Sequence, residues 1–299
     1  MARRNESFGQ ICYNKQMRGD EGMEYQEIEF VKINPAENTT IFVISPVEKE
    51  KRAETAKKLM SYGSVQAEQV GFITRNPAEG IDGHVEMMGG EFCANASRSL
   101  AAYLAFCGQM PQEDGFYRIT CSGCETIMLA SVEKSEIPSV MKAEIRIPLP
   151  RAIDPIALDV DGQPAVFYRT AFAGITHYVL PNGGGKCCES CWQAVKKWAD
   201  EDSYDALGMI AFDLDTEQMK AAVYVKETDT LYWERSCGSG TAALGAVLAV
   251  LEKDTISIPV RQEGGTIEVT AYCKDGRLKT LLIGGEVEIA AKGTAYIRL

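Results

Sequence analysis

Two cysteines of this chain occupy equivalent positions in two similar stretches of sequence, and their thiols could take part in proton transfer. Cys93 begins the stretch CANASRSLAAYLAF, and Cys237 begins CGSGTAALGAVLAV, which aligns with the first stretch without a gap at an offset of 144 residues. The apolar run behind each cysteine predicts a helix that starts at the cysteine. A thiol at a helix start meets unpaired backbone N–H groups and the positive end of the helix dipole, which lower its pKa and favour the thiolate.

Small residues follow both cysteines, so a ligand could approach the backbone N–H groups of the helix start closely. A carboxylate is the natural ligand for such groups. Two helix starts that converge on the carboxylate of an amino acid would place its Cα between two sulfur atoms. One thiolate could then remove the Cα proton while the opposite thiol delivers a proton to the other face, which inverts the stereocentre. The same N–H groups would stabilise the carbanion-like transition state.

The alternative interpretation of both cysteines is structural, because most free cysteines are small buried hydrophobes. Duplication at the same helix-start position favours a function instead. We therefore treat Cys93 and Cys237 as the candidate catalytic pair.

The segments around the two predicted helices repeat as well. Three short strands with Gly-containing turns follow each helix, at 117–120, 125–130 and 141–147 and again at 255–260, 266–270 and 278–283. Further strands are predicted at 28–33, 40–44, 69–74, 165–171, 176–180, 208–212 and 221–225, and further helices at 48–61 and 189–199. Many short strands with few helices indicate an α+β fold. We expect two pseudo-symmetric domains, each a mixed or antiparallel β-sheet wrapped around a central helix.

The predicted domains are residues 23–150 and 151–286, joined by a linker in the Pro-containing segment 148–155. Residues 1–22 are polar and without periodicity, so we expect a flexible N-terminal extension.

Composition excludes several classes of function. Lys and Arg number 31 against 42 Asp and Glu, and the net charge of −11 argues against nucleic-acid or acidic-membrane partners. No run approaches the roughly 18 apolar residues of a membrane span, and the N-terminus lacks the apolar stretch of a secretory signal. Ten cysteines are too few for a disulfide scaffold. We expect a cytoplasmic enzyme with reduced thiols and a small-molecule substrate, and leave a homodimer open.

The residues around both cysteines resemble diaminopimelate epimerase and its relatives, the cofactor-independent two-cysteine amino-acid racemases. FCANASR at 92–98 is similar to the family's first motif, normally Cys-Gly-Asn-Gly-Ala-Arg, and WERSCGSGT at 233–241 is similar to the second. NTTIFV at 38–43 and GITH at 174–177 stand where the family has two further segments. The resemblance extends from about Tyr25 to Leu299. It implies that residues 287–299 return to the first domain.

The resemblance also implies roles for individual residues. Cys93 and Cys237 correspond to the acid/base pair, and no cofactor or metal is implied. Asn38 and Glu234 would lie near the α-amino group or the thiols, and His177 behind a catalytic sulfur. The backbone of four residues would hold the α-carboxylate: Ala94, Asn95, Gly238 and Ser239. Without the resemblance, His177 would be interpreted as a strand histidine with a satisfied hydrogen bond.

Several positions depart from diaminopimelate epimerases. Only Ser236 separates the Glu-Arg pair from Cys237, where those enzymes typically carry a Gly-rich insert. Ile175 occupies the position of a family Asn, and MIAF at 209–212 replaces another Asn-containing strand. An unpaired polar substrate end would cost about 1–3 kcal/mol per group, which argues against diaminopimelate. The motifs are more similar to the histidine-racemase branch, and Arg235 is a candidate partner for a polar side chain or the carboxylate.

Two other motifs compete with this interpretation. Gly238 to Ala243 satisfies the dinucleotide fingerprint, with Glu263 further on, but the predicted elements that follow are strands rather than a βαβ crossover. The CxxC pairs 121/124 and 188/191, with Cys187 adjacent, suggest zinc, but 64 residues separate them, against roughly 15–20 in a compact ribbon. Their role stays open.

The sequence therefore predicts an isomerase that racemises or epimerises a free amino acid at Cα, with histidine as the preferred substrate. Diaminopimelate epimerase is the alternative within the family. A non-catalytic amino-acid-binding protein on the same scaffold is the alternative from another class.

Overall fold

The computed structural model describes residues 25–74, 78–183, 188–200, 204–226 and 229–298. Within these ranges the chain forms sixteen strands, four α-helices and one short 3₁₀-helix. The extension predicted at 1–22 and Cys187 lie outside the described residues. None of the helices in the described ranges is long and apolar enough to cross a membrane.

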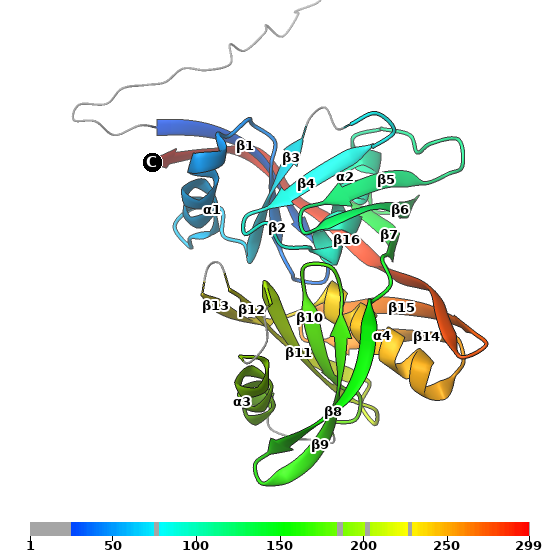
Figure 1. Cartoon of the computed structure of the whole chain (residues 1–299). Helices are drawn as coiled ribbons and strands as arrows, with labels where there is room; N and C mark the ends of the chain where they lie inside the picture. The colour runs from blue at the N-terminus through cyan, green and yellow to red at the C-terminus, as the bar shows by residue number, and fades with distance from the viewer. Residues whose placement is uncertain (1–24, 75–77, 184–187, 201–203, 227–228, 299) are drawn as a thin grey trace, which may run out of the picture.

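The elements of the first half form the upper lobe in Figure 1. In chain order they are β1 (Tyr25–Asn34), β2 (Thr40–Val43), η1 (Lys49–Lys51), α1 (Arg52–Met60), β3 (Gln69–Thr74), β4 (Gly83–Met87), α2 (Ala94–Phe106), β5 (Tyr117–Cys121), β6 (Cys124–Lys134) and β7 (Val140–Ile147).

The elements of the second half form the lower lobe, and the last strand runs from the lower lobe into the upper one (Figure 1). They are β8 (Ala152–Val160), β9 (Gln163–Ala171), β10 (Thr176–Leu180), α3 (Cys188–Ala199), β11 (Ala206–Asp213), β12 (Gln218–Val225), β13 (Thr230–Glu234), α4 (Gly238–Glu252), β14 (Ile256–Gln262), β15 (Gly265–Lys274) and β16 (Arg277–Arg298).

The two halves pair their strands in the same order. In the first half β1 is antiparallel to β2, β2 is parallel to β3, β3 is antiparallel to β4, and β4 is parallel to β5. Strands β9, β10, β11, β12 and β14 repeat this sequence of orientations, with α3 and α4 in the places of α1 and α2. Antiparallel strands complete each half. The sequence repeat therefore belongs to a repeated topology, and the predicted α+β class is confirmed.

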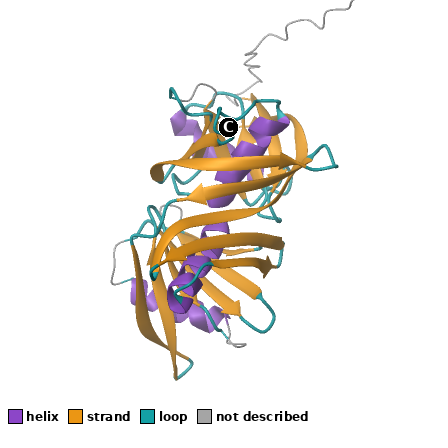
Figure 2. Ribbon diagram, turned by 90° about the vertical axis from the view of Figure 1, so that its right-hand side faces the viewer, coloured by secondary structure: helices purple, strands orange, loops and turns teal. Residues whose placement is uncertain are grey.

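Strand β16 connects the lobes because it pairs with three strands in succession. It pairs with β15 up to Gly284, with β7 from Leu281 to Glu288, and with β1 from Glu288 to Arg298. Since β1 also pairs with β2, the strands of the upper lobe close into a ring around α2. Figure 2 shows a helix enclosed by strands in each lobe.

Helices α2 and α4 occupy these central positions because they are apolar and small on nearly all sides. In α4 every residue from Gly238 to Val247 is buried. Gly245 lies so close to the Val269 side chain of β15 that an added Cβ would overlap it. Small residues thus let the strands approach the helix.

Three strands were not anticipated from the sequence. The predicted linker at 148–155 is wrong in its second part, because β8 begins at Ala152 and pairs Pro155 with Tyr168 of β9. β8 lies at the edge of the sheet, where a residue without a backbone N–H is tolerated. β4 and β13 were also missed, and both are five residues long.

Candidate active site

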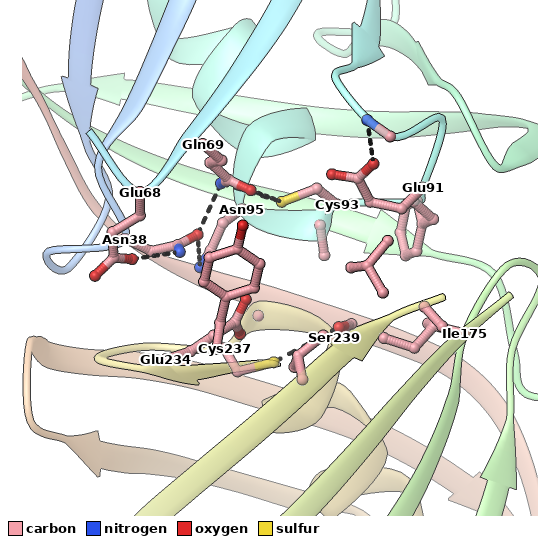
Figure 3. Close-up of a pocket in the computed structure, with 18 of the residues that line it drawn as sticks. Asn38, Glu68, Gln69, Glu91, Cys93, Asn95, Ile175, Glu234, Cys237 and Ser239 are labelled. Carbon is pink, nitrogen blue, oxygen red and sulfur yellow. Dashed lines mark hydrogen bonds between the residues drawn. The ribbon is translucent and has the colours of Figure 1, made fainter. Parts of the chain in front are cut away.

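A cavity of about 290 Å³ opens between the starts of α2 and α4. Residues of both lobes line it, and Figure 3 shows Cys93 and Cys237 approaching it from opposite sides. Its wall is partly apolar, with Phe92, Ile175 and Trp233 among the lining residues. The predicted pair of cysteines is thus brought to one cavity.

Both cysteines are the N-caps of their helices, as the sequence predicted. The Sγ of Cys93 accepts a hydrogen bond from the backbone N–H of Ala96 at 3.3 Å, and the Sγ of Cys237 accepts one from Gly240 at 3.2 Å. The two preceding N–H groups of each helix have no acceptor within the helix. They belong to the four residues predicted to hold a carboxylate: Ala94, Asn95, Gly238 and Ser239.

Cys93 has a neutral amide beside it. Gln69 Nε2 lies 3.4 Å from the Cys93 Sγ, and the Gln69 Oε1 lies 3.5 Å from the same sulfur. The Gln69 Nε2 also donates to Asn38 Oδ1 at 2.9 Å and to Thr40 Oγ1 at 2.8 Å. The amide is therefore fixed by the upper lobe and can contact the sulfur as thiol or thiolate.

Cys237 has a carboxyl group and a hydroxyl beside it. Its thiol hydrogen bonds to the Glu234 carboxyl, and its Sγ lies 3.7 Å from Ser239 Oγ. Gln262 of β14 accepts from the Cys237 N–H at 2.7 Å and donates to Thr241 Oγ1 at 3.0 Å, which holds the helix start in place. The two equivalent cysteines thus have chemically different neighbours.

The expected lowering of the thiol pKa values is wrong for this state of the site. Burial raises the pKa of Cys93 to about 12, more than the N–H of Ala96 lowers it. Burial, followed by the Glu234 carboxylate, raises the pKa of Cys237 well above its ordinary value. Desolvation of a thiolate outweighs one or two N–H groups when no water or cation replaces the lost solvation. Both thiols are therefore protonated at neutral pH.

Three carboxyl groups share the cavity. Glu68, Glu91 and Glu234 line it, and none of the described residues that line it is Lys, Arg or His. Burial, together with the charges of Glu68 and Glu91, raises the pKa of Glu234 to about 7. Burial also raises the pKa of Glu68. The cavity is therefore suited to a ligand that carries positive charge or hydrogen-bond donors.

Asn95 joins the two cysteine motifs. Its Nδ2 donates to Asn38 Oδ1 at 3.2 Å and to the carbonyl oxygen of Ser236, next to Cys237, at 3.5 Å. An added Cβ at Gly238 would lie 2.8 Å from Asn95 Oδ1, so the two helix starts meet directly. Asn38 in turn donates to Glu68 Oε2 at 2.8 Å.

His177 lies behind the site rather than in its wall. It is fully buried, and its Nε2 lies 2.9 Å from Ser239 Oγ, which contacts the Cys237 sulfur. Burial lowers the pKa of His177 to about 3, so the ring is neutral at physiological pH. Its ring packs against Gly208 of β11, where a Cβ would overlap Nδ1.

Arg235 does not line the cavity. Its guanidinium pairs with Glu37 at 2.6 Å and with Glu263 at 2.8 Å, and the side chain is half exposed. The neighbouring Glu234 points to Cys237 because successive residues at the end of a strand face opposite sides.

Glu68, Gln69 and Glu91 are cavity residues that sequence reasoning missed. Gln69 is the first residue of β3 and is in parallel register with Thr40 on β2, and Glu68 comes directly before it. The available signal was the polar pair Glu68 and Gln69 at the start of an apolar strand. The order of the strands along the chain did not show which strand lies beside this one, so the pair could not be assigned to the cavity.

The competing motifs have packing explanations. Gly240 lies against Ile210 and the Cys237 side chain, and Glu263 is paired with Arg235. Cys121 and Cys124 flank the turn between β5 and β6, whereas Cys188 and Cys191 lie on α3 in the other lobe. Among the residues the structure describes, no group of three or more His, Cys, Asp or Glu side chains could hold a metal ion.

Known sequences match this chain over nearly its whole length. The family described as "Histidine racemase CntK N-terminal domain" matches residues 27–296. The chain belongs to the histidine racemase family. A histidine racemase of Fusobacterium nucleatum subsp. nucleatum is 34% identical over 275 residues, which cover 91% of this chain and 98% of the relative. One of Staphylococcus aureus is 30% identical over 283 residues, which cover 92% and 100%. The protein is thus an isomerase, an amino-acid racemase, and the resemblance to this branch is confirmed.

Solved racemase and epimerase structures share the fold of this family member. A probable proline racemase from Agrobacterium radiobacter superposes with a TM-score of 0.63 at 11% identity, covering 89% of this chain and 92% of the other. A hydroxyproline epimerase from Agrobacterium vitis gives 0.61 at 10% identity, with 91% and 93% covered.

Proposed function

We propose that this protein racemises free histidine at Cα by a two-base mechanism that needs neither pyridoxal phosphate nor metal. The observation that carries the proposal is the pair of N-cap cysteines that face one cavity from opposite sides. The cavity would then lie between two pseudo-symmetric domains, residues 23–150 with 287–299 and residues 151–286. The repeated strand order supports this division.

The substrate carboxylate binds at the two helix starts in this proposal. The backbone N–H groups of Ala94, Asn95, Gly238 and Ser239 have no acceptor within their helices, and both helix dipoles are positive there. Binding the carboxylate at this point orients Cα between the two sulfur atoms. As the Cα proton leaves, the same N–H groups stabilise the negative charge that spreads onto the carboxylate.

The proton balance of the reaction involves Glu234. The two thiols and the Glu234 carboxyl group can each hold one proton. Catalysis requires that one of these protons is lost, so that one sulfur atom can be a thiolate. Glu234 loses that proton first, because its pKa of about 7 lies below the pKa values of both thiols. Proton transfer from a thiol to Glu234 then produces one thiolate. This thiolate takes the Cα proton, the opposite thiol gives its proton to the other face, and the thiol and the thiolate have exchanged places.

Histidine suits the charge of the cavity. Its α-ammonium and imidazole N–H groups are donors for the carboxylates of Glu68, Glu91 and Glu234. Diaminopimelate carries a second carboxylate, which would meet these carboxyl groups with no Lys or Arg among the described lining residues to bind it. The histidine racemase names of the relatives support the same substrate.

Incubation of the protein with single amino acids in D2O tests the proposal. We expect L-histidine and D-histidine to interconvert and to acquire deuterium at Cα, as measured by chiral chromatography and mass spectrometry. Preference for diaminopimelate would support the epimerase alternative. Absence of exchange and inversion across a broad panel would leave only a binding protein. Because thiols must stay reduced, the assay includes a reductant, and the mechanism requires a reducing compartment such as the cytoplasm.

The assignment of the cysteines is tested by Cys93→Ser and Cys237→Ser. Each variant should lose racemisation by about 10²–10⁴-fold, because a serine hydroxyl is a far weaker base than a thiolate. Cys107→Ser is the matched control, since Cys107 is the exposed C-cap of α2 at the far end of the same helix. Full racemisation by either site variant would refute the two-base assignment.

A further inference from the structure

Three charged side chains join the two lobes outside the cavity. Arg235 follows β13 of the lower lobe, Glu37 lies in the turn between β1 and β2 of the upper lobe, and Glu263 lies in the turn between β14 and β15 of the lower lobe. The Nε and Nη2 of Arg235 each lie 2.6 Å from Glu37 Oε2, and its Nη1 donates to Glu263 Oε1 at 2.8 Å. All three guanidinium nitrogens are thus engaged, and we call the three residues the interlobe clamp.

The backbone segments that carry the clamp also contact each other. The N–H of Gly264 donates to the carbonyl oxygen of Arg235 at 2.9 Å, and the Oγ of Ser236 donates to the carbonyl oxygen of Pro35 at 3.3 Å. An added Cβ at Gly264 would overlap the carbonyl oxygen of Ala36. The β14–β15 turn of the lower lobe therefore lies directly against the β1–β2 turn of the upper lobe.

The β1–β2 turn has an unfavourable backbone conformation at this contact. Ala36 and Glu37 have φ angles of 58° and 61°, in the left-handed region that a Cβ disfavours. The N–H of Glu37 donates to Asn34 Oδ1 at 2.7 Å. Such a conformation persists only where surrounding contacts hold it, and it is found preferentially at functional sites. Arg235 and Gly264 supply contacts of this kind from the other lobe.

In the upper lobe, the clamp adjoins an asparagine of the site. Asn38 follows Glu37 directly in the chain and is buried. Its Oδ1 accepts hydrogen bonds from Gln69 at 2.9 Å and from Asn95 at 3.2 Å. Since Gln69 also contacts the Cys93 sulfur, a shift of Glu37 would move the amides that surround this thiol.

In the lower lobe, the other two members of the clamp adjoin residues that contact Cys237. Glu234 precedes Arg235, and the Cys237 thiol hydrogen bonds to its carboxyl group. Gln262 precedes Glu263, and its Oε1 accepts from the N–H of Cys237 at 2.7 Å. The clamp therefore connects the surroundings of both sulfur atoms.

We propose that Arg235 is a positioning residue that holds the two lobes at the separation at which the Cys93 and Cys237 sulfur atoms face one ligand. This proposal rests on the two-base function proposed above. Proton transfer to and from Cα needs both sulfur atoms aligned with it, so a small change in their separation lowers the rate. Because Arg235 does not line the cavity, it acts through the segments that it joins.

The clamp differs from an ordinary ion pair on a protein surface. The side chains of Arg235 and Glu37 are 44% and 49% exposed, and a single pair of this exposure contributes little. Networks of several charges with forked arginine contacts are stronger, and a lysine could not make them. The two residues are also 198 positions apart in the chain, so their pairing acts on the arrangement of the lobes and not on a local turn.

Hydrogen–deuterium exchange, measured by mass spectrometry without any substrate, tests the clamp. Rates are compared for the wild type, Arg235→Gln and Glu37→Gln in peptides that contain residues 35–40 and 261–266. Arg118→Gln is the matched control, because the ion pair of Arg118 with Asp114 has side chains 30% and 45% exposed but joins residues four positions apart.

We expect exchange in both peptides to become about threefold faster or more in Arg235→Gln and in Glu37→Gln, because loss of the pairing populates more open forms. Arg118→Gln should stay within about twofold of wild type. The double variant Glu37→Gln/Arg235→Gln should exchange no faster than Arg235→Gln, because both substitutions remove the same contact. Unchanged exchange in the single variants, or a multiplied effect in the double variant, would overturn the proposal. Glu37→Gln provides the test if Arg235→Gln does not fold.

Kinetics with histidine distinguish positioning from substrate binding. Arg235→Gln should lower kcat by about tenfold or more while KM stays within about threefold, because no contact with the substrate is removed. A tenfold higher KM with unchanged kcat would mean that Arg235 binds the substrate, and this result or two unchanged constants would overturn the proposal. The exchange rates do not depend on racemisation, so failure of the proposed function and failure of this inference give separate results.

Discussion

Glu234 and His177 both support Cys237, but their protonation behaves differently at neutral pH. Burial raises the pKa of Glu234 to about 7 and lowers that of His177 to about 3. Glu234 therefore titrates in the physiological range, whereas His177 stays neutral and can act only through its hydrogen bond with Ser239. The pH dependence of the site should follow Glu234.

We expect kcat/KM to rise with pH through about 7, as Glu234 loses its proton, and then to level off. In Glu234→Gln the first proton must come from a thiol, so activity at pH 7 should fall and should keep rising with pH beyond 9. Initial rates of histidine racemisation, taken about every pH unit between pH 5.5 and 10, measure this pH profile. An unchanged profile in Glu234→Gln would exclude Glu234 as the titrating group.

The same carboxyl group should affect stability. Its pKa rises from 4.5 to about 7 on folding, so the folded state holds the proton more tightly. The stability it contributes is present below pH 4.5 and is lost as pH rises through 7, on the order of 3 kcal/mol or less. The unfolding free energy of Glu234→Gln relative to that of wild type should therefore increase as the pH is raised from 5 to 9, as measured by urea unfolding. A constant difference across that range would contradict the prediction.

At the scale of elements, the close approach of β10 and β11 positions His177. The two strands are parallel, and His177 is in register with Gly208. The imidazole lies over the Cα of Gly208 and takes the space of a side chain. Position 208 must therefore be glycine for the ring to reach Ser239.

Gly208→Ala should displace His177 and destabilise the protein by about 1–3 kcal/mol, because the added Cβ would overlap the ring. Racemase activity should fall as well, since Ser239 loses its partner. Gly63→Ala is the control, because no atom lies within 4 Å of its added Cβ. Thermal unfolding and initial rates measure both variants, and equal stability of the two would show that the ring can move without cost.

At the scale of the whole molecule, β16 determines how the first lobe closes. Its last residues pair with β1, and Ile297 packs with Leu59 of α1 and Phe72 of β3 in one apolar cluster. The end of the chain is thereby built into the core of the lobe that contains Cys93.

Ile297→Asp should destabilise the protein by about 3–5 kcal/mol or prevent folding, because it buries a charge in this cluster. Tyr296→Asp is the matched control on the same strand, since Tyr296 is 72% exposed and Ile297 only 4%. It should change stability by less than about 1 kcal/mol. Urea midpoints compare the two, and similar losses would mean that the last strand is not anchored by its buried face.

Local patterns in the sequence were sufficient to predict most of the elements and the position of both cysteines at helix starts. The apolar runs behind Cys93 and Cys237 placed both thiols at helix starts, which the N-cap geometry confirms. The strands at 69–74 and 176–180 were predicted with their observed bounds. These features depend on periodicity and capping, which act between residues a few positions apart.

Properties of the site that depend on residues distant in the chain required the folded structure. The thiol pKa values rise because both lobes exclude water from the sulfur atoms. Arg235 faces Glu37 instead of the cavity, and Glu68 and Gln69 enter it, because strand register decides which side each residue faces. Burial and register arise only when segments from both halves pack together, so the sequence could identify the two cysteines but not the charges that surround them.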